Sequence, residues 1–382
     1  KPSTKLRQMH KTMSTLPQFT NHHWAKLRND WLLWWQGELD RPLVVIEAFD
    51  AQSGFGYEHL YPNLFQFDPG MAPEQVLSQV EVVIQSVHWL GDAYPRWWLN
   101  FGPGVLAAFL GSQARYENGT TWFHPILKEA DLKTVSLSLD PENEFYQRVL
   151  GIFKAAVKRW GKMLTIGYPD LGGILDILAS LRSTEKLLLD LVDTPREVIR
   201  LCNEIAEVWL EVFSQLNQNL ETAERGFSSW APLWMPANGY MLQCDFAYMI
   251  SPRMFKTFVL PTLITCSQAI QYPFYHLDGK GQLPHLKSLL EIEQLKGIQW
   301  IPGDGAPPAE DWPEVLTEIR HHHKLCQVYV TPAGAQKIVR ELGGQGLVLS
   351  LWEQDHSGGH RNLTLEEAEL ALEMLRREGV TI

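Results

Sequence analysis

Short apolar runs that alternate with helical patterns are the feature that most constrains the fold of this chain. From about Leu43 to the C-terminus, these runs are separated by longer stretches with apolar residues at three- and four-residue spacing. Such alternation is typical of α/β proteins with parallel strands. The runs that predict strands are Leu43–Ala48, Trp97–Asn100, Met163–Ile166, Phe227–Trp230, Phe274–Leu277, Gly297–Ile301, Gln327–Val330 and Leu347–Leu351. Eight strands in this order predict a closed (β/α)8 TIM barrel.

Helix signals lie between these runs. The predicted helices are Pro141–Trp160, Pro195–Ala223, Pro252–Ile270, Asp311–His323 and Thr364–Arg377. The first three open with Asp-Pro, Thr-Pro or Ser-Pro, which is typical of a cap followed by proline in the first turn. The last opens with Thr364 and, three residues later, Glu367, which predicts a capping box. We therefore expect an N-terminal helical extension over residues 1–40 and one barrel domain over residues 41–382.

Composition excludes several classes of protein. A net charge of −11 argues against a general affinity for nucleic acid or for an anionic membrane, because both need a basic face. No apolar run approaches the roughly 18 residues of a membrane span, and residues 1–19 lack the apolar segment of a signal peptide. The four Cys form no CxxC pair, which argues against a structural zinc module or a disulfide scaffold. A cytoplasmic location is the expectation.

Four stretches carry a resemblance to a known superfamily. They are Tyr168–Gly173 (YPDLGG), Phe246–Pro261 (FAYMISPRMFKTFVLP), Phe274–Gly279 (FYHLDG) and Gly346–Ser350 (GLVLS). In this order, they resemble the uroporphyrinogen decarboxylase and corrinoid methyltransferase superfamily. The resemblance implies a TIM-barrel enzyme that acts on a small molecule, with a corrinoid protein as a possible partner and no nucleotide cofactor.

The chain departs from the decarboxylase branch of that superfamily. The family's arginine-rich loop corresponds here to Glu47–Gly54, which contains no arginine, and Asn100 stands near the position of an essential aspartate. A neutral amide cannot stabilise a cationic pyrrole intermediate as a carboxylate does. We therefore expect no genuine uroporphyrinogen decarboxylation.

His276 and Asp278 form the clearest candidate site. Residues two apart on a strand lie on the same face, so both side chains are expected at the barrel mouth. In the methyltransferases that the chain resembles, the corresponding His-x-Cys and a later cysteine bind zinc; the later position falls at about Glu353. The resemblance thus implies a metal site of His276, Asp278 and Glu353, with zinc expected first and manganese or iron also admitted by oxygen ligands. The alternative is a hydrogen-bonded pair that orients a substrate without metal.

Other residues near predicted strand ends are weaker candidates. Each acid or base there is a candidate for catalysis if burial shifts its pKa. The candidates for catalysis are Asp170, Asp304 and His356, and those for substrate binding are Asn100, Tyr168, Trp230 and Trp352.

Three functions remain open at this point. The first is metal-assisted transfer of a methyl or related group on a small molecule. The second is a metal-free decarboxylase or lyase that acts on a small acid or a porphyrinogen, with Asp278 or His276 as the proton donor. The third is a non-catalytic barrel that binds a small molecule. Fold alone does not decide between them.

Overall fold

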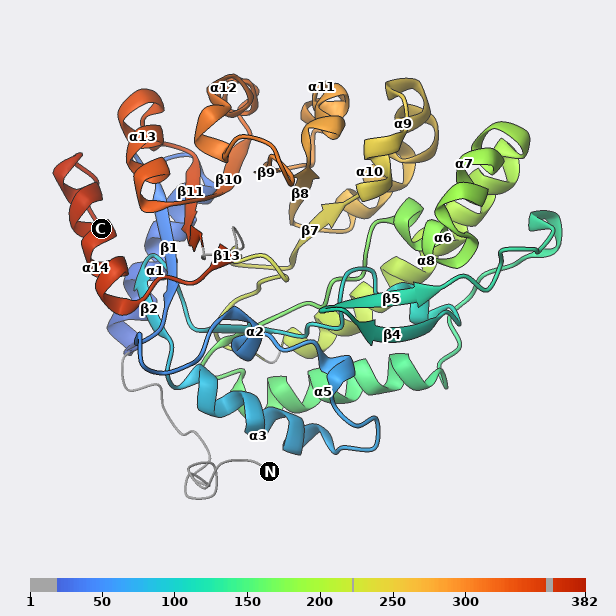
Figure 1. Cartoon of the computed structure of the whole chain (residues 1–382), viewed down its shortest axis with the longest axis horizontal. Helices are drawn as coiled ribbons and strands as arrows, with labels where there is room; N and C mark the ends of the chain where they lie inside the picture. The colour runs from blue at the N-terminus through green and yellow to red at the C-terminus, as the bar shows by residue number, and fades with distance from the viewer. Residues whose placement is uncertain (1–18, 222, 355–359) are drawn as a thin grey trace.

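A computed structural model describes residues 19–221, 223–354 and 360–382 as a mixed α/β structure built on a central sheet (Figure 1). The order of the seven strands is β2-β1-β11-β10-β9-β8-β7. All neighbours pair in parallel except β2, which runs antiparallel to β1. The strands are β1 (Leu43–Ala48), β2 (His88–Gly91), β7 (Gly239–Gln243), β8 (Tyr272–Asp278), β9 (Gly297–Ile301), β10 (Leu325–Val330) and β11 (Leu347–Leu351).

Helices follow the strands from β7 onward and cover one face of the sheet (Figure 1). They are α9 (Pro252–Phe258), α10 (Leu260–Gln268), α11 (Leu286–Leu290), α12 (Pro313–His321), α13 (Pro332–Leu342) and α14 (Leu365–Arg377). The capping box at Thr364 and Glu367 is confirmed. The helix predicted over Pro252–Ile270 is divided at Val259, directly before Leu260 and Pro261.

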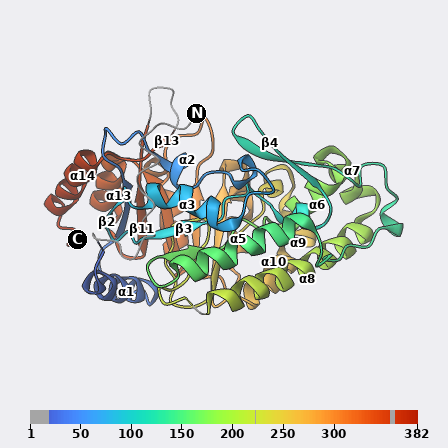
Figure 2. The same ribbon diagram turned by 90° about the horizontal axis from the view of Figure 1, so that it is seen from below.

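Helix α1 (Asn21–Trp35) packs against the other face of the sheet. Its residues Trp24, Leu27, Trp31 and Trp34 form a buried cluster with Phe274 and with residues near the start of other strands. Tyr275 and Leu277 of β8, which alternate with Phe274 and His276, belong instead to the larger core beneath the helices. Alternation along β8 therefore separates a helix-covered face from a face that α1 closes at the amino ends of the strands. Figure 2 shows α1 and strand β13 (His360–Arg361) on opposite sides of the sheet.

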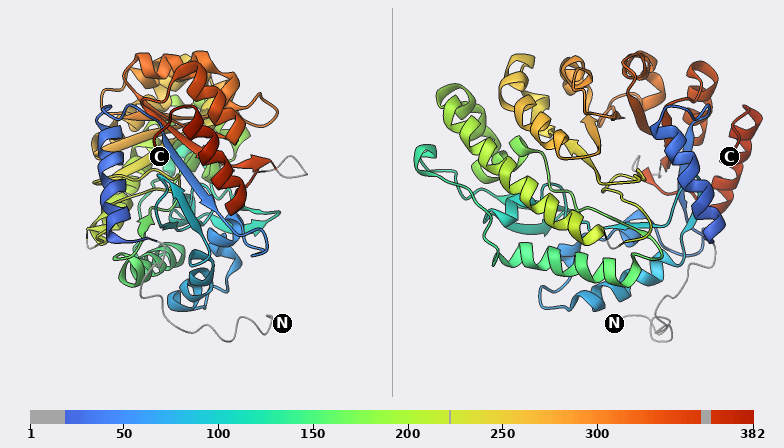
Figure 3. Two further views of the ribbon diagram at one scale, coloured as in Figure 1. Left: turned by 90° about the vertical axis from the view of Figure 1, so that its left-hand side faces the viewer. Right: turned by 180° about the vertical axis from the view of Figure 1, so that it is seen from behind.

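A second group of elements lies beside the central sheet. Helices α5 and α8 run side by side, on the side of the molecule away from α12 and α13 (Figure 3). Helix α5 begins at Glu144 with Asn143 as its cap, three residues later than the predicted start at Pro141. The helices of this group are α2 (Tyr57–Leu60), α3 (Pro73–Ile84), α4 (Leu106–Phe109), α5 (Glu144–Trp160), α6 (Ile174–Arg182), α7 (Thr184–Asp193) and α8 (Pro195–Leu220). Three two-stranded sheets complete the description: β3 (Arg96–Trp98) with β6 (Thr165–Gly167), β4 (Gln113–Glu117) with β5 (Thr120–His124), and β12 (Glu353–Gln354) with β13 (His360–Arg361).

The described residues form the expected α/β structure with a largely parallel central sheet, but they do not form the predicted closed barrel. Strands β3 and β6 pair with each other and form a sheet separate from the central one. The predicted strand Phe227–Trp230 is instead an irregular segment with isolated bridges, one of them from Ser228 to Gly167 of β6. The hydroxyls of Ser228 and Ser229 bond to the backbone of Ala231, and such local bonds compete with a ladder. The strand that pairs with β8 at the edge of the central sheet is β7, which begins at Gly239 and was not predicted from the sequence.

No helix within the described ranges is both long enough and apolar enough to cross a membrane.

Candidate metal centre

His276 and Asp278 lie together at the carboxyl end of β8, as predicted. The Nε2 atom of His276 is 3.7 Å from Oδ2 of Asp278. The imidazole is largely buried, with 15% of its side chain exposed, whereas 42% of the Asp278 side chain is exposed. The pair thus offers one shielded nitrogen and one accessible carboxylate at the edge where the parallel strands end.

Asp245 is the third member of this group. It follows β7, the neighbour of β8, and its carboxylate meets the other two side chains so that one ligand atom of each lies within 4.8 Å of the others. The backbone N–H groups of Asp245 and Phe246 donate to Asp176, at 3.0 and 2.7 Å. Asp176, in the first turn of α6, therefore holds the segment that carries Asp245.

The surroundings shift the pKa values of these groups. Burial opposes protonation of His276, but the interaction with Asp278 and the charges of Asp245 and Asp278 outweigh it and raise the pKa of the imidazole. Burial raises the pKa of Asp170 to about 7, with a further rise from the charge of Asp245. The pKa of Asp176 also rises to about 7 for the same two reasons. The carboxylates of Asp245 and Asp278 therefore favour the charged form of the one imidazole in this group.

Two further contacts hold the imidazole in place. On one side, Nδ1 of His276 is hydrogen-bonded to Oε1 of Gln299. On another, the Trp230 ring meets the imidazole edge to face, with centroids 5.0 Å apart. Trp230, predicted to bind substrate, is thus in contact with the predicted metal ligand.

The structure does not bring Glu353 into this group. Its carboxylate accepts from the backbone N–H of Gln354, within the short β12–β13 hairpin. The count along the chain that led to Glu353 assumed the superfamily's spacing after the last strand, and here that segment turns into the hairpin. Among the described residues, the third acid or base that lies with His276 and Asp278 is Asp245. His356 lies outside the described residues.

The remaining candidates lie in different environments. Asp170 is buried, with its Oδ1 accepting from the N–H of Gly172. Both ends of the Asn100 amide bond to backbone, at the carbonyl of Tyr61 and the N–H of Gly102. Asp304 is exposed in the turn after β9.

Tyr168 and Trp352, the two other aromatic residues predicted to bind substrate, also lie in different environments. Tyr168 is fully buried, and its hydroxyl donates to Asn217 of α8, so it contributes to the helix-covered core and not to the strand-end group. Trp352 directly follows β11 and its ring lies against His360.

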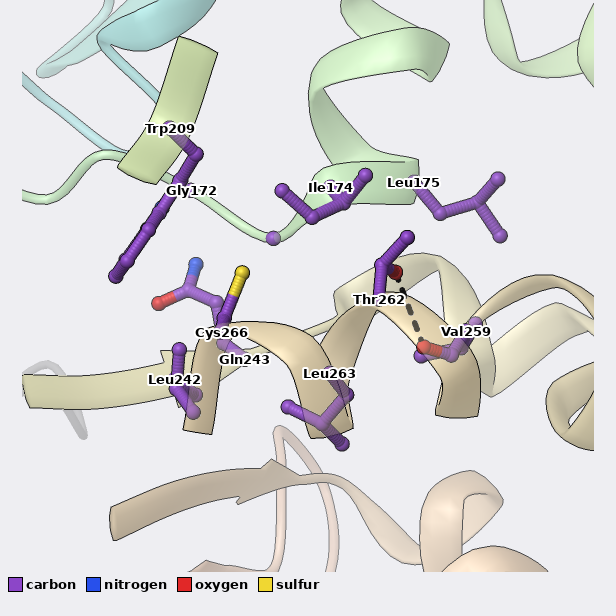
Figure 4. Close-up of a pocket in the computed structure, with 11 residues that line it drawn as sticks. Gly172, Ile174, Leu175, Trp209, Leu242, Gln243, Val259, Thr262, Leu263 and Cys266 are labelled. Carbon is purple, nitrogen blue, oxygen red and sulfur yellow. Dashed lines mark hydrogen bonds between the residues drawn. The ribbon is translucent and has the colours of Figure 1, made fainter. Parts of the chain in front are cut away.

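A small cavity lies between β7 and the helices, and Asp245, His276 and Asp278 do not line it (Figure 4). It has a volume of about 20 Å³ and is lined by Gly172, Gln243, Thr262 and Cys266 among others. A volume of this size suits about one water molecule and is too small for a substrate. In the group of three side chains itself, Asp245 is exposed and Asp278 is partly exposed.

A second charged pair is buried between β1 of the central sheet and β3 of the separate β3–β6 sheet. Glu47 of β1 and Arg96 of β3 lie 3.3 Å apart, with 10% and 2% of their side chains exposed. Arg96 also donates to the carbonyl of Trp230, at 2.7 Å, and Tyr61 donates to Glu47. This pair fixes the backbone of the tryptophan that contacts His276.

Sequence reasoning missed Asp245, Asp176 and Gln299. Asp245 directly precedes the Phe246–Pro261 stretch that carried the resemblance, so an acid beside a family motif was the available signal. Gln299 lies in the middle of an apolar run, where a polar residue is a signal of a specific partner.

Comparisons with known proteins support the fold. Neither the protein-family models nor the curated protein sequences give a match. A solved structure of a methyltransferase from Methanosarcina mazei is similar, with a TM-score of 0.60 and 14% identity, over 93% of this chain and 99% of that chain. The likeness extends over nearly the whole of both chains and concerns the fold.

Proposed function

We propose that this protein is an enzyme that transfers a methyl or related one-carbon group on a small molecule, assisted by a divalent cation bound by Asp245, His276 and Asp278. The observation that carries the proposal is the convergence of these three side chains at the carboxyl ends of neighbouring parallel strands. The likeness to a methyltransferase fold supports the choice of reaction class.

The donor set fits a divalent cation. One imidazole nitrogen and two carboxylate oxygens suit zinc and also admit manganese or iron. Ligand atoms that share one such ion lie roughly 3–4 Å apart, because each is about 2.0–2.2 Å from it. The Nε2 to Oδ2 distance of 3.7 Å between His276 and Asp278 agrees with this spacing.

The protein's own residues have distinct parts in this proposal. When bound, the cation would polarise an oxygen of the substrate or activate a hydroxyl. Asp176 holds the Asp245 segment through two backbone N–H groups, and Trp230 shields one side of the imidazole. A corrinoid protein as methyl donor or acceptor remains part of the hypothesis that the superfamily resemblance suggests.

Metal binding by purified protein tests the proposal. After treatment with a chelator, the protein is titrated with Zn²⁺ in a calorimeter, and one site per chain is expected. His276→Ala and Asp245→Asn should each weaken binding at least about tenfold, since each removes a direct ligand. Asp304→Asn, which changes an exposed acid outside the group, is the matched control and should bind as the unmodified protein does. Glu353→Gln should also leave binding unchanged.

Two results would contradict the metal proposal. One is the absence of a saturable site in the unmodified protein, and the other is equal loss of binding in the control variant.

A metal-free lyase is the second candidate, and one observation favours it. Burial raises the pKa of Asp170 to about 7, which suits a carboxyl that gives up a proton near neutral pH. In that case, activity on a small acid persists in a chelator and falls in Asp170→Asn, whereas the metal-assisted enzyme is inactive in the chelator.

A further inference from the structure

A row of buried polar side chains crosses the sheet and ends at His276. Oε1 of Gln299 is bonded to the imidazole Nδ1, Nε2 of Gln299 donates to Oε1 of Gln327 at 3.0 Å, and Nε2 of Gln327 donates to the Ser350 hydroxyl at 3.0 Å. The four residues come from four consecutive strands, β8 to β11, which are neighbours in the sheet. Gln299 and Gln327 are fully buried and Ser350 is 2% exposed.

Such a row is costly unless every member is paired. An unpaired buried amide destabilises the folded state, whereas an apolar residue at the same position has no polar group to satisfy. Below this row on the same face, β8 and β10 carry Phe274 and Leu325, which pack in the apolar cluster with α1. The change from apolar to polar occurs at the level of His276, which is the only titratable member of the row.

We propose that Gln299, Gln327 and Ser350 are positioning residues that hold His276 with its proton on Nδ1 and direct Nε2 toward Asp245 and Asp278. The positioning role rests on the proposed function only for its purpose. That purpose is to present the lone pair of the His276 Nε2 atom to a cation. The hydrogen-bond geometry stands without it.

The hydrogen bonds fix the direction of the row. An amide oxygen can only accept, so Oε1 of Gln299 requires the proton on Nδ1 and leaves Nε2 to face Asp278. Only the oxygen of Gln299 can accept from Nδ1, so the amide must turn its nitrogen toward Gln327. Gln327 in turn presents its oxygen to Gln299 and its nitrogen to Ser350. Each amide is thereby held in one of its two orientations by the next.

The tautomer of His276 in metal-free protein tests the inference directly. Protein with ¹⁵N-labelled histidine is studied by long-range ¹⁵N–¹H NMR at alkaline pH, where the ring is neutral, and the His276 signals are identified by their loss in His276→Gln. The expected form is the Nδ1–H tautomer. In Gln299→Leu, we expect a shift toward the Nε2–H tautomer, which is the commoner form of a free imidazole.

The order of the row gives further variants. Gln327→Leu should produce a smaller shift of the same sign, because Gln299 then loses its anchor, and adding Gln327→Leu to Gln299→Leu should change the tautomer no further. Gln282→Leu is the matched control: Gln282 is also buried, but it bonds to Tyr275 outside the row. It should leave the tautomer unchanged. If Gln299→Leu does not fold, the tautomer of His276 is measured in Gln327→Leu and Ser350→Ala instead, and a shift toward Nε2–H is again expected.

The outcomes separate this inference from the proposed function. An Nε2–H tautomer in the unmodified protein, or an unchanged tautomer in the folded variants of Gln299 and Gln327, overturns the positioning role whether or not metal binds. If the unmodified protein binds no Zn²⁺, the metal proposal fails and the tautomer result stands. If both hold, Gln299→Leu weakens Zn²⁺ binding about 10- to 100-fold, as loss of a hydrogen bond to a ligating histidine does.

Discussion

Asp170 shows how a single buried carboxyl connects the site to stability. Burial raises its pKa from 3.8 to about 7, so the folded state holds a proton that the unfolded chain has released over this range of pH. Its contribution to the free energy of unfolding is therefore fully present below the unfolded pKa and is lost as the pH rises through about 7.

Asp170→Asn should remove this pH dependence. The amide keeps an oxygen that can accept from Gly172 and cannot ionise. We expect the variant to match the unmodified protein at acid pH and to be more stable at alkaline pH, by a few kcal/mol at most, since one pKa unit is worth about 1.4 kcal/mol. Urea unfolding of both proteins across the window measures the difference. A variant that is less stable by the same amount at every pH would contradict the argument.

The buried Glu47–Arg96 ion pair affects stability in a different way, because each charge needs the opposite charge of its partner. Both side chains are nearly buried and 3.3 Å apart. Glu47→Gln leaves the guanidinium without its counter-charge, which we expect to cost about 3 kcal/mol in the free energy of unfolding. The control is Glu373→Gln, which breaks the exposed pair with Arg377 on α14 and should cost less than about 1 kcal/mol. If chemical denaturation gives the same loss in free energy of unfolding for Glu47→Gln and Glu373→Gln, burial of the Glu47–Arg96 pair does not increase its contribution to stability.

At the scale of secondary-structure elements, the capping box at the start of helix α14 allows a direct test of what one helix cap contributes to stability. The Thr364 hydroxyl accepts from the N–H of Glu367, and the Glu367 carboxylate accepts from the N–H of Thr364. Thr364→Ala should therefore cost about 1 kcal/mol of stability. Thr194→Ala is the control, because Thr194 occupies the same position before α8 and makes no side-chain capping bond. It should cost clearly less by thermal or urea unfolding.

Some strands of the central sheet could be predicted from the sequence and others could not. Strands β1, β9 and β11 coincide with the predicted runs because each is a short segment of mostly apolar residues, nearly all of which the sheet buries. The Phe227–Trp230 run is equally apolar at its ends, but the serines between them bond locally, and β7 starts at a glycine and ends at a glutamine. Local pattern cannot decide between two such candidates, since the choice depends on which one pairs with β8.

The candidate site was predictable to the extent that it lies on one strand. His276 and Asp278 are two residues apart on β8, so alternation alone brings them together. Asp245 lies 31 positions before His276 in the chain and reaches it only because β7 and β8 are neighbours. Glu353 was inferred from spacing in other proteins, and the hairpin that it forms with Arg361 depends on pairing that no count along the chain reveals.

On the scale of the whole molecule, the N-terminal helix closes the sheet on the face that carries His276. Trp34 is fully buried, with its ring 5.6 Å from Trp31 and 6.2 Å from Phe274, which lies two residues before His276 on β8. The residues 1–40 that sequence set apart as an extension thus contribute, through α1, part of the core beneath the site. We expect α1 and the sheet to unfold together.

Trp34→Ala tests this coupling. Removing a buried indole costs about 3–5 kcal/mol, through lost burial and the cavity that remains. If α1 and the sheet form one cooperative unit, the whole cost appears as a shift of a single transition, seen equally by far-ultraviolet circular dichroism and by tryptophan fluorescence. Trp122→Ala is the control, since Trp122 on the β4–β5 hairpin is 54% exposed and should change stability by less than about 0.5 kcal/mol. Two separate transitions in Trp34→Ala, with the sheet melting as in the unmodified protein, would instead make α1 an independent extension, because the sheet would then keep its stability without the indole beneath β8.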